Sequence, residues 1–281
     1  MRFSVFQAEE NVELVLDGDI FSLSDTLDCG QAFRWKETED GAFEGVAFGK
    51  YKKIRQEENK LIFYDTDISE FEEIWVDYFD LDRDYSYIKE VISKNENLKK
   101  ACEFAGGIRV LRQDPWECLC SFIISQNNNI PRIKGIIERL CGGFGERLKN
   151  GYYTFPTAEK IAPLSLEDLA PLRSGFRAKY ILDAAKKVAS GEINLEKISK
   201  MKSDQARAEL VKIYGVGEKV ADCVLLFGMG HVEVLPKDVW IKRVLANLFD
   251  GALPDFAEPY AGIAQQYLFH FARMTKLEIG E

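Results

Sequence analysis

Short segments that mix aromatic and β-branched residues with polar ones fill the first quarter of the chain. Five of them lie between residues 11 and 64, with turn-forming polar residues between them: VELVLD, QAFRW, AFEGVAFG, YKKIRQ and KLIFYD. Residues of these types favour strands, and polar or glycine-containing punctuation marks turns. The pattern predicts an antiparallel sheet over residues 11–64.

The hydrophobic period changes to that of helices from about residue 100. Asp114, followed by Pro115 and Glu117, is a helix start signal. Aspartate caps the first amides, proline suits the first helical position, and glutamate suits the third. A helix is therefore predicted to run through Gln126.

Two amphipathic helices are predicted next, because apolar residues recur at i, i+3, i+4 and i+7. The first covers residues 133–140 and is expected to end at Gly142-Gly143. The second covers residues 181–188 and is expected to end at Gly191, since glycine commonly follows the last helical turn.

A further pair of helices is predicted to meet across a three-residue hairpin. One runs from Ser203 to Tyr214 and stops at the Gly215-Val216-Gly217 sequence. The other restarts at once, with Val220 and later apolar residues on one side.

The patterns together predict an α+β fold with two domains. An N-terminal antiparallel β-sheet domain would cover residues 1–100, and a mostly helical domain would cover residues 101–281, with its helix–hairpin–helix at about 203–228. The seam is expected in the charged stretch near residues 90–105, because no long flexible linker is present.

Composition fits a folded protein. The chain has 281 residues, 46% of them hydrophobic, and a formal net charge of −9. It has no apolar run of about 18 residues and no N-terminal pattern of a secretory signal. We expect a cytoplasmic monomer, nucleoid-associated if the source is prokaryotic.

Cysteine and histidine usage narrows the chemistry. The six cysteines contain no CxxC pair, which argues against a disulfide framework and a structural zinc site. Only His231 and His270 are present, so a histidine-based metal centre or a Ser–His–Asp triad has few candidates.

The acidity belongs to the first third of the chain. Residues 1–100 hold 13 Lys and Arg against 24 Asp and Glu, whereas residues 171–223 hold 11 basic against 7 acidic side chains. A local basic excess suits a polyanion such as nucleic acid, but a solvated helix face gives the same count.

The Gly215-Val216-Gly217 sequence also suits an anion, because the helix after it presents free N–H groups. An ordinary tight helix–helix turn fits the same pattern.

Lys219 falls in the first turn of that helix, where the dipole favours the neutral, nucleophilic amine, although most helical lysines are simply solvated. Asp238 precedes another amphipathic segment and fits a helix N-cap.

Residues 210–244, LVKIYGVGEKVADCVLLFGMGHVEVLPKDVWIKRV, closely resemble the helix–hairpin–helix, Gly/Pro-rich loop and aspartate (HhH-GPD) signature of a DNA glycosylase superfamily. Three other segments resemble the 8-oxoguanine DNA glycosylases: residues 29–35 (CGQAFRW), residues 113–132 (with SQNNNI), and residues 259–269 (from PYAG). The four matches span most of the chain, and such a set is more specific than any one motif.

The resemblance implies a base excision repair enzyme. It would flip 8-oxoguanine out of duplex DNA, preferably opposite cytosine, excise it, and cut the abasic strand by β-elimination. Lys219 would attack C1′ and form a Schiff base. Asp238 would stabilise positive charge at the sugar while it also caps its helix.

The resemblance also implies the base pocket. The Gly30 carbonyl would accept the proton that 8-oxoguanine, unlike guanine, carries at N7. Phe269 and Cys223 would lie on the two faces of the base, and Gln265 would pair with its Watson–Crick edge. By residue type alone, Gln265 and Phe269 are equally a surface amide and a core aromatic.

Contacts to the opposite strand follow from the same resemblance. Asn127 would fill the vacated stack, Arg132 and Arg177 would donate to the orphaned cytosine, and Phe176 would act as a wedge. By residue type alone, Asn127 fits a helix stop and the arginines fit solvated helix ends.

At the hairpin, the resemblance implies that Gly215 and Gly217 bind a phosphate. A monovalent cation would be held by the main-chain carbonyls of Val211, Ile213 and Val216. No cofactor would be required.

Trp240 departs from the family pattern, which has a phosphate-contacting histidine there, so stacking on a sugar is the alternative. The last cysteine is Cys223, whereas endonuclease III relatives carry four clustered C-terminal cysteines, so no iron–sulfur cluster is expected. Two other functions stay open: a glycosylase of the same superfamily for another damaged base, and a non-catalytic DNA-binding module.

Overall fold

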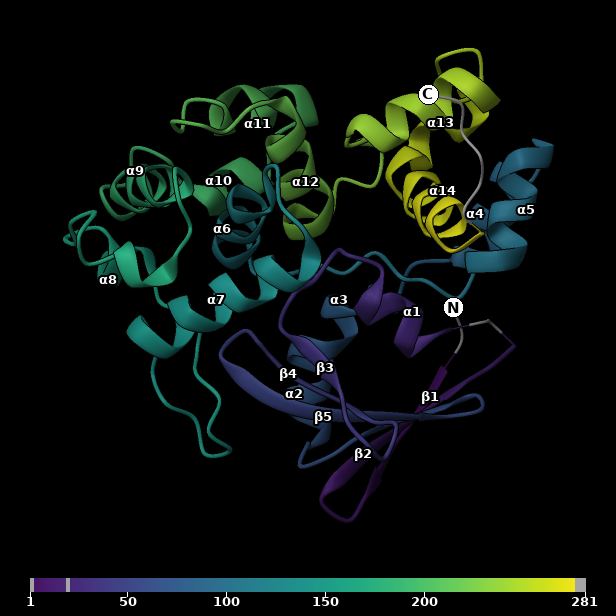
Figure 1. Cartoon of the computed structure of the whole chain (residues 1–281). Coiled ribbons are helices and arrows are strands. Elements are labelled where there is room, and N and C mark those ends of the chain that lie inside the picture. The colour runs from purple at the N-terminus through teal and green to yellow at the C-terminus, as the bar shows by residue number, and fades with distance from the viewer. Residues whose placement is uncertain (1–2, 19–20, 276–281) are drawn as a thin grey trace.

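The computed structural model describes residues 3–18 and 21–275, which form a sheet with helices above it (Figure 1). The strands are β1 (Phe3–Ala8), β2 (Asn11–Leu16), β3 (Trp35–Glu37), β4 (Phe43–Ala47), β5 (Lys50–Glu57) and β6 (Lys60–Phe63). The α-helices of the first part are α1 (Leu23–Asp28), α2 (Ile68–Glu70), α3 (Val76–Tyr78), α4 (Tyr85–Ile92) and α5 (Glu96–Ala105). Those that follow are α6 (Pro115–Ser125), α7 (Ile130–Phe144), α8 (Ala158–Ile161), α9 (Arg177–Ala189), α10 (Leu195–Ser199), α11 (Ser203–Leu210), α12 (Glu218–Met229), α13 (Val239–Leu248) and α14 (Ala261–Thr275). A π-helical turn η1 (Phe71–Trp75) and the 3₁₀ turns η2 (Ala170–Leu172) and η3 (Asp255–Tyr260) complete the set.

The strands pair antiparallel in the order β1-β2-β6-β5-β4-β3. In β2 the burial alternates, with Val12, Leu14 and Leu16 facing the core, as a half-buried strand requires. Aromatic rings from η1 and α3 pack on this face, including Trp75, whose ring lies 6.1 Å from that of Phe63. The sheet therefore has its own hydrophobic core.

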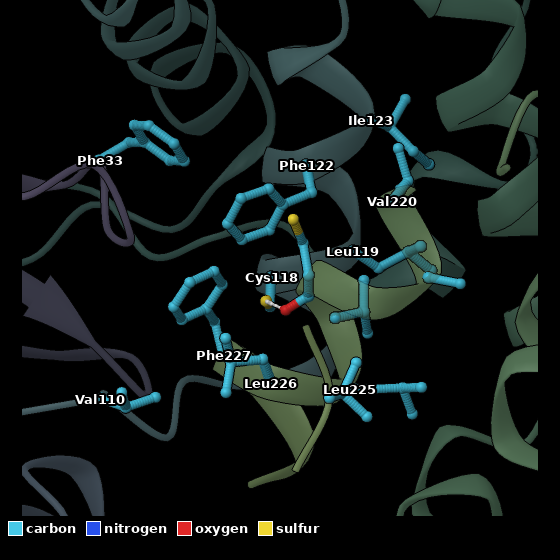
Figure 2. Close-up of a cluster of buried hydrophobic side chains, with 14 of the residues drawn as sticks. Phe33, Val110, Cys118, Leu119, Phe122, Ile123, Val220, Leu225, Leu226 and Phe227 are labelled. Atoms are coloured by element: carbon cyan, nitrogen blue, oxygen red, sulfur yellow. Dashed lines mark hydrogen bonds between the residues drawn. The ribbon is translucent and has the colours of Figure 1, made fainter. Parts of the chain in front are cut away.

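A second and larger core lies among the helices. Helices α6 and α12 pack against each other at its centre. Phe122 of α6 stacks on Phe227 of α12 with ring centroids 5.4 Å apart, and Cys118 lies beside them (Figure 2). This contact holds the C-terminal part of α12 against α6.

Buried polar contacts join the sheet region to the helices. The Gln31 side chain donates to the Arg109 carbonyl and accepts from the Leu111 amide. The main-chain carbonyl of Gln31 accepts from the Gln113 side chain. Arg34 forms an ion pair with Glu117 of α6 at 3.2 Å. Burial raises the pKa of Glu117, and the Arg34 charge opposes that rise.

The predicted α+β fold is confirmed, but two strand predictions are wrong. β1 lies outside the predicted range, because residues 3–8 carry no alternating buried face. Residues 31–34 are not strand, because the Gln31 side chain satisfies backbone groups of residues 26, 109 and 111 instead of lying in a sheet.

The predicted helix starts at Asp114 and Asp238 are confirmed, since each side chain accepts from an amide three residues on. Three helix predictions are wrong. Helices already occur between residues 68 and 105, before the predicted change of period near residue 100. Helix α7 continues through Gly142-Gly143, where it was expected to end, because both glycines are exposed and unhindered. Helix α11 ends at Leu210 and not at Tyr214. The domain boundary near residue 100 falls within α5 and stays a prediction.

None of the helices within residues 3–18 and 21–275 has the length and apolarity to cross a membrane. The six cysteines are free and buried, as the absence of CxxC pairs indicated. Within the same residues, no three His, Cys, Asp or Glu side chains are grouped so that they could hold a metal ion.

Candidate functional site

The connection between α11 and α12 is longer than the predicted three-residue hairpin and spans residues 211–217. Amides of Lys212, Ile213 and Val216 bond to carbonyls three residues earlier, so the chain continues as tight turns after α11. Gly215 adopts φ +82°, and a Cβ there would lie 2.4 Å from the Tyr180 ring. Both its conformation and its contact with Tyr180 require glycine.

Gly217 is in a different situation. Its φ of −95° suits any residue, and nothing lies within 4 Å of where its Cβ would be. As the N-cap of α12 it offers no side chain to the first amides of the helix. The protein itself therefore gives no reason for glycine at this position, whereas an anion approaching the free amides would.

The main-chain carbonyls predicted to hold a cation lie in the same connection. Among the described residues, the carbonyls of Val211 and Val216 accept no main-chain hydrogen bond, and that of Ile213 accepts one, from Val216. Because a carbonyl oxygen has two lone pairs, all three retain a free acceptor site. The donor set fits a monovalent cation.

Lys219 lies in the first turn of α12 and is half-buried. Its Nζ lies 5.4 Å from the centre of the Phe122 ring. Burial raises the pKa of the neighbouring Cys223 thiol to about 11, and contact with Lys219 opposes that rise. At neutral pH, Cys223 is therefore a protonated, apolar side chain next to an amine.

Asp238 caps α13 and accepts from the Ile241 amide at 2.7 Å. Its charge raises the pKa of the Cys223 thiol, whereas that of Lys219 lowers it, so both predicted catalytic residues lie within electrostatic reach of Cys223. Trp240, in the first turn of α13, is exposed. An exposed ring beside Asp238 fits the stacking alternative for this position.

The predicted base pocket has two of its walls in contact. Gly30 has φ +88°, and a Cβ there would lie 3.7 Å from Cδ1 of Ile130 and 3.9 Å from Cε1 of Phe269. Gly30 follows α1, and Phe269 lies in α14. The structure thus brings together residues from opposite ends of the chain.

Gln265 lies one helical turn before Phe269 and is 6% exposed. Its Oε1 atom is buried and has no hydrogen-bond partner among the described residues. An unpaired buried acceptor costs about 1–3 kcal/mol, so such a group is usually satisfied by a ligand or water. Gln265 is therefore suited to accept from a bound molecule.

Phe33 links this pocket to the lysine. It lies three residues after Gly30, and its ring centre lies 5.9 Å from that of Phe122 (Figure 2). Since Lys219 lies over the Phe122 ring, the Gly30 loop and the amine share one aromatic surface.

The loop at Asn127 is held by Arg177. Asn127 has φ +47° and an exposed side chain. The Arg177 guanidinium is buried and donates to the carbonyls of Gln126, Asn127 and Ser174, the Asn127 bond measuring 2.8 Å. Burial and the nearby Arg132 charge lower the pKa of Arg177. Most of its donors are therefore engaged by the protein, whereas the sequence indicated a solvated or base-contacting side chain.

Arg132 and Phe176 are exposed on either side of this loop. The Arg177 guanidinium lies 4.5 Å from the Phe176 ring centre, and the Phe176 and Tyr180 rings meet edge to face at 5.7 Å. Tyr180 therefore connects the predicted wedge to the Gly215 turn.

Phe122, Ile130 and Tyr180 were not identified as site residues from the sequence. Each contacts a predicted site residue from a separate element. No local pattern distinguishes them from core or surface residues, because their role depends only on where the helices meet.

Two family models cover most of the chain. The 8-oxoguanine DNA glycosylase N-terminal domain matches residues 13–119, and the HhH-GPD superfamily base excision DNA repair protein model matches residues 120–251.

Known proteins resemble the chain over most of its length. It is 31% identical to the N-glycosylase/DNA lyase of Saccharomyces cerevisiae, over 83% of this chain and 69% of that protein. It is 33% identical to a probable N-glycosylase/DNA lyase of Methanothermobacter thermautotrophicus, over 71% of this chain and 72% of that protein. The structure of the Clostridium acetobutylicum 8-oxoguanine glycosylase/lyase with double-stranded DNA containing cytosine opposite 8-oxoguanine superposes with a TM-score of 0.92, at 38% identity, covering 99% of this chain and 100% of that one. The chain therefore belongs to the 8-oxoguanine DNA glycosylase family within the HhH-GPD superfamily of base excision DNA repair proteins.

Proposed function

We propose that this chain excises 8-oxoguanine from double-stranded DNA and then cleaves the abasic strand through a Schiff base at Lys219. The observation that carries the proposal is a half-buried amine at a helix start that has no side-chain cap, next to the buried Cys223 thiol. The unpaired amide oxygen of Gln265 adds an acceptor for a base. Family membership adds that related proteins are named N-glycosylase/DNA lyase.

Lys219 acts as the nucleophile. The neutral amine attacks C1′, the glycosidic bond breaks with its electron pair on the base, and the base takes up a proton. The adduct opens to a Schiff base, which makes the C2′ proton acidic, and its loss expels the 3′ phosphate. The Phe122 ring, whose centre lies 5.4 Å from Nζ, and the buried Cys223 thiol are the neighbours of this amine within the core.

Asp238 stabilises positive charge at the sugar. Its side chain is held by the Ile241 amide, so the carboxylate is oriented before substrate binds. Charge stabilisation by a fixed group acts mainly in the transition state, where the cation develops.

The base pocket distinguishes the lesion by hydrogen bonding. The N1–H and N2–H groups on the Watson–Crick edge of 8-oxoguanine satisfy the unpaired Gln265 oxygen. The N7–H of 8-oxoguanine donates to the Gly30 carbonyl, which meets an acceptor instead when guanine is present. Phe269 and Cys223 enclose the two faces of the base.

Arg132, Arg177, Asn127 and Phe176 read the opposite strand and favour cytosine. Cytosine offers O2 and N3 as acceptors for arginine donors. Because Arg177 donates to loop carbonyls, its approach to a base requires those bonds to exchange. Arg132 is exposed and free of this constraint.

Gly215 and Gly217 place a phosphate at the α12 N-terminus. A monovalent cation at the carbonyls of Val211, Ile213 and Val216 would add positive charge there. No step of the reaction itself passes through this ion.

Borohydride trapping tests the proposal. Duplexes with 8-oxoguanine opposite each of the four bases should give a covalent adduct with the wild-type chain, most with cytosine, and none with Lys219→Gln. Lys200→Gln is a matched control, since Lys200 is an exposed lysine paired only with Glu196 on the surface. Binding without an adduct would identify a non-catalytic DNA-binding module, and an adduct only with another lesion would identify a glycosylase for a different base.

A further inference from the structure

Two side chains outside the proposed base pocket connect its walls. His270 directly follows Phe269 in α14, and its Nε2 lies 3.5 Å from Oδ1 of Asp25 in α1. Helix α1 ends with Cys29 as its C-cap, immediately before Gly30. The contact therefore joins the helix that carries Phe269 to the helix that positions Gly30.

A second hydrogen bond also joins α14 to the residues before Gly30. The Gln266 side chain donates to the Cys29 carbonyl at 3.3 Å, and both residues are buried. Cys29 precedes Gly30, and a Cβ on Gly30 would lie 3.9 Å from the Phe269 ring. The separation of Gly30 and Phe269 is thus set by polar contacts of the residues next to them.

Other charged side chains lie near the His270–Asp25 contact. The His270 side chain is 10% exposed and that of Asp25 is 39% exposed. Charged side chains that line the adjacent cavity of about 420 Å³ are Asp28, Lys36, Glu37, Lys134 and Arg273. Lys134 pairs with Asp28, and the Phe104 ring lies 6.0 Å from the His270 ring. The hydrogen bond from His270 lowers the pKa of the Asp25 carboxyl, so Asp25 stays ionised.

We propose that Asp25 and His270 are a positioning pair that fixes the place of Gly30 relative to Phe269, and thereby the binding of the extruded base. The inference rests on the proposed function. Neither side chain touches the base, and the pair acts by keeping two pocket walls at a fixed distance. Sites need their groups held within about 0.5 Å, so a small shift of Gly30 weakens the hydrogen bond that its carbonyl accepts from the base.

Asp25→Asn removes the charge of the pair without changing its size. It should raise KM for a duplex with 8-oxoguanine opposite cytosine by about two- to fivefold, the range expected for loss of one partly exposed contact of a carboxylate. The kcat should change less than KM, because Lys219 and Asp238 are undisturbed. Cleavage of a duplex with a preformed abasic site should stay unchanged, because no base occupies the pocket.

The matched control is Asp28→Asn, which removes a carboxylate from the same helix and the same cavity but one that pairs with Lys134. It should leave KM as in the wild type. The double variant Asp25→Asn with His270→Ala should raise KM no more than His270→Ala alone, because partners that act as a unit are not additive.

The outcomes separate this inference from the proposed function. A wild-type chain that neither releases 8-oxoguanine nor forms an adduct refutes the proposed function. An active wild type with an unchanged KM in Asp25→Asn overturns only the positioning pair. Equal loss of abasic-site cleavage and base release in Asp25→Asn also overturns it, because that result indicates a general loss of folding.

Discussion

The two glycines of the α11–α12 connection should respond to the same substitution in opposite ways. Gly215→Ala places a methyl group where φ is +82° and the Tyr180 ring atoms are 2.4 Å away. Gly217→Ala places the same group in open space with φ −95°. The first should therefore affect folding, and the second should affect only DNA binding.

The expected magnitudes differ by several-fold. A left-handed conformation costs an alanine about 1–2 kcal/mol. Displacing the Tyr180 ring costs about 1–3 kcal/mol more, so Gly215→Ala should lower the free energy of unfolding by about 2–5 kcal/mol. In Gly217→Ala, the poorer N-cap costs about 0.5–1 kcal/mol, and the reduced entropy of the unfolded chain offsets about as much. Its stability should stay within about 1 kcal/mol of the wild type.

For DNA affinity, Gly217→Ala is the variant expected to show the specific effect. A methyl group at Gly217 keeps a phosphate away from the α12 amides, and a lost charge-assisted hydrogen bond is worth about 1.5–3 kcal/mol. Gly217→Ala should therefore weaken binding to a duplex with a stable abasic analogue by about 10- to 150-fold.

Urea denaturation measures the stabilities, and fluorescence anisotropy at one fixed salt concentration measures the affinities. In a Tyr180→Ala background, Gly215→Ala should cost only the conformational part of the loss, because the ring that it crowds is gone. Wild-type stability in Gly215→Ala, or wild-type affinity in Gly217→Ala, would contradict the assignment of these two positions.

Three further results are expected. Asp238→Asn should lower kcat more than it weakens binding to lesion DNA, as measured by single-turnover kinetics and anisotropy, and a fall in stability with unchanged kcat would leave Asp238 only as a helix cap. Arg132→Ala should narrow the cytosine-to-adenine ratio of kcat/KM and leave stability unchanged. Arg177→Ala should narrow the same ratio and also lower the free energy of unfolding by about 2–4 kcal/mol, because three carbonyls lose their donors. Equal stabilities of the two variants in denaturant would disprove this difference. Burial raises the pKa of Cys223 from 9.0 to about 11, so the thiol loses its proton first in the unfolded state. The free energy of unfolding should therefore fall as pH rises from 9 toward 11. Urea titrations at pH 8 and 10 should show a smaller fall for Cys223→Ala than for the wild type.

Much of the local structure follows from the sequence alone. The caps at Asp114 and Asp238, the strands β2, β4, β5 and β6, and the helix that starts after Gly217 each depend on residues within one or two turns of one another. Local hydrogen bonds and the hydrophobic period determine such features wherever the segment lies. The order of motifs along the chain also indicated the family, which the family models confirm.

Other features were decided by contacts between distant segments. Residues 31–34 have the composition of a strand, but Gln31 bonds to backbone near residue 110. Gly215 and Gly217 look alike in the sequence, and only the folded structure distinguishes them, by the positive φ of Gly215 and the Tyr180 ring beside it. Arg177 has the pattern of a solvated helix end, but the loop at Asn127 engages most of its donors.

The pocket walls show the physical reason. Gly30, Lys219 and Phe269 carry no mutual signal in the sequence, because no local hydrogen bond or period relates residues so far apart. Gly30 lies close to Phe269, and Lys219 close to Phe122, because the helices pack around one hydrophobic core. Burial of apolar surface is non-directional and indifferent to distance along the chain. The sequence determines which faces are apolar, and only the packing of those faces decides which polar groups come to lie beside the amine.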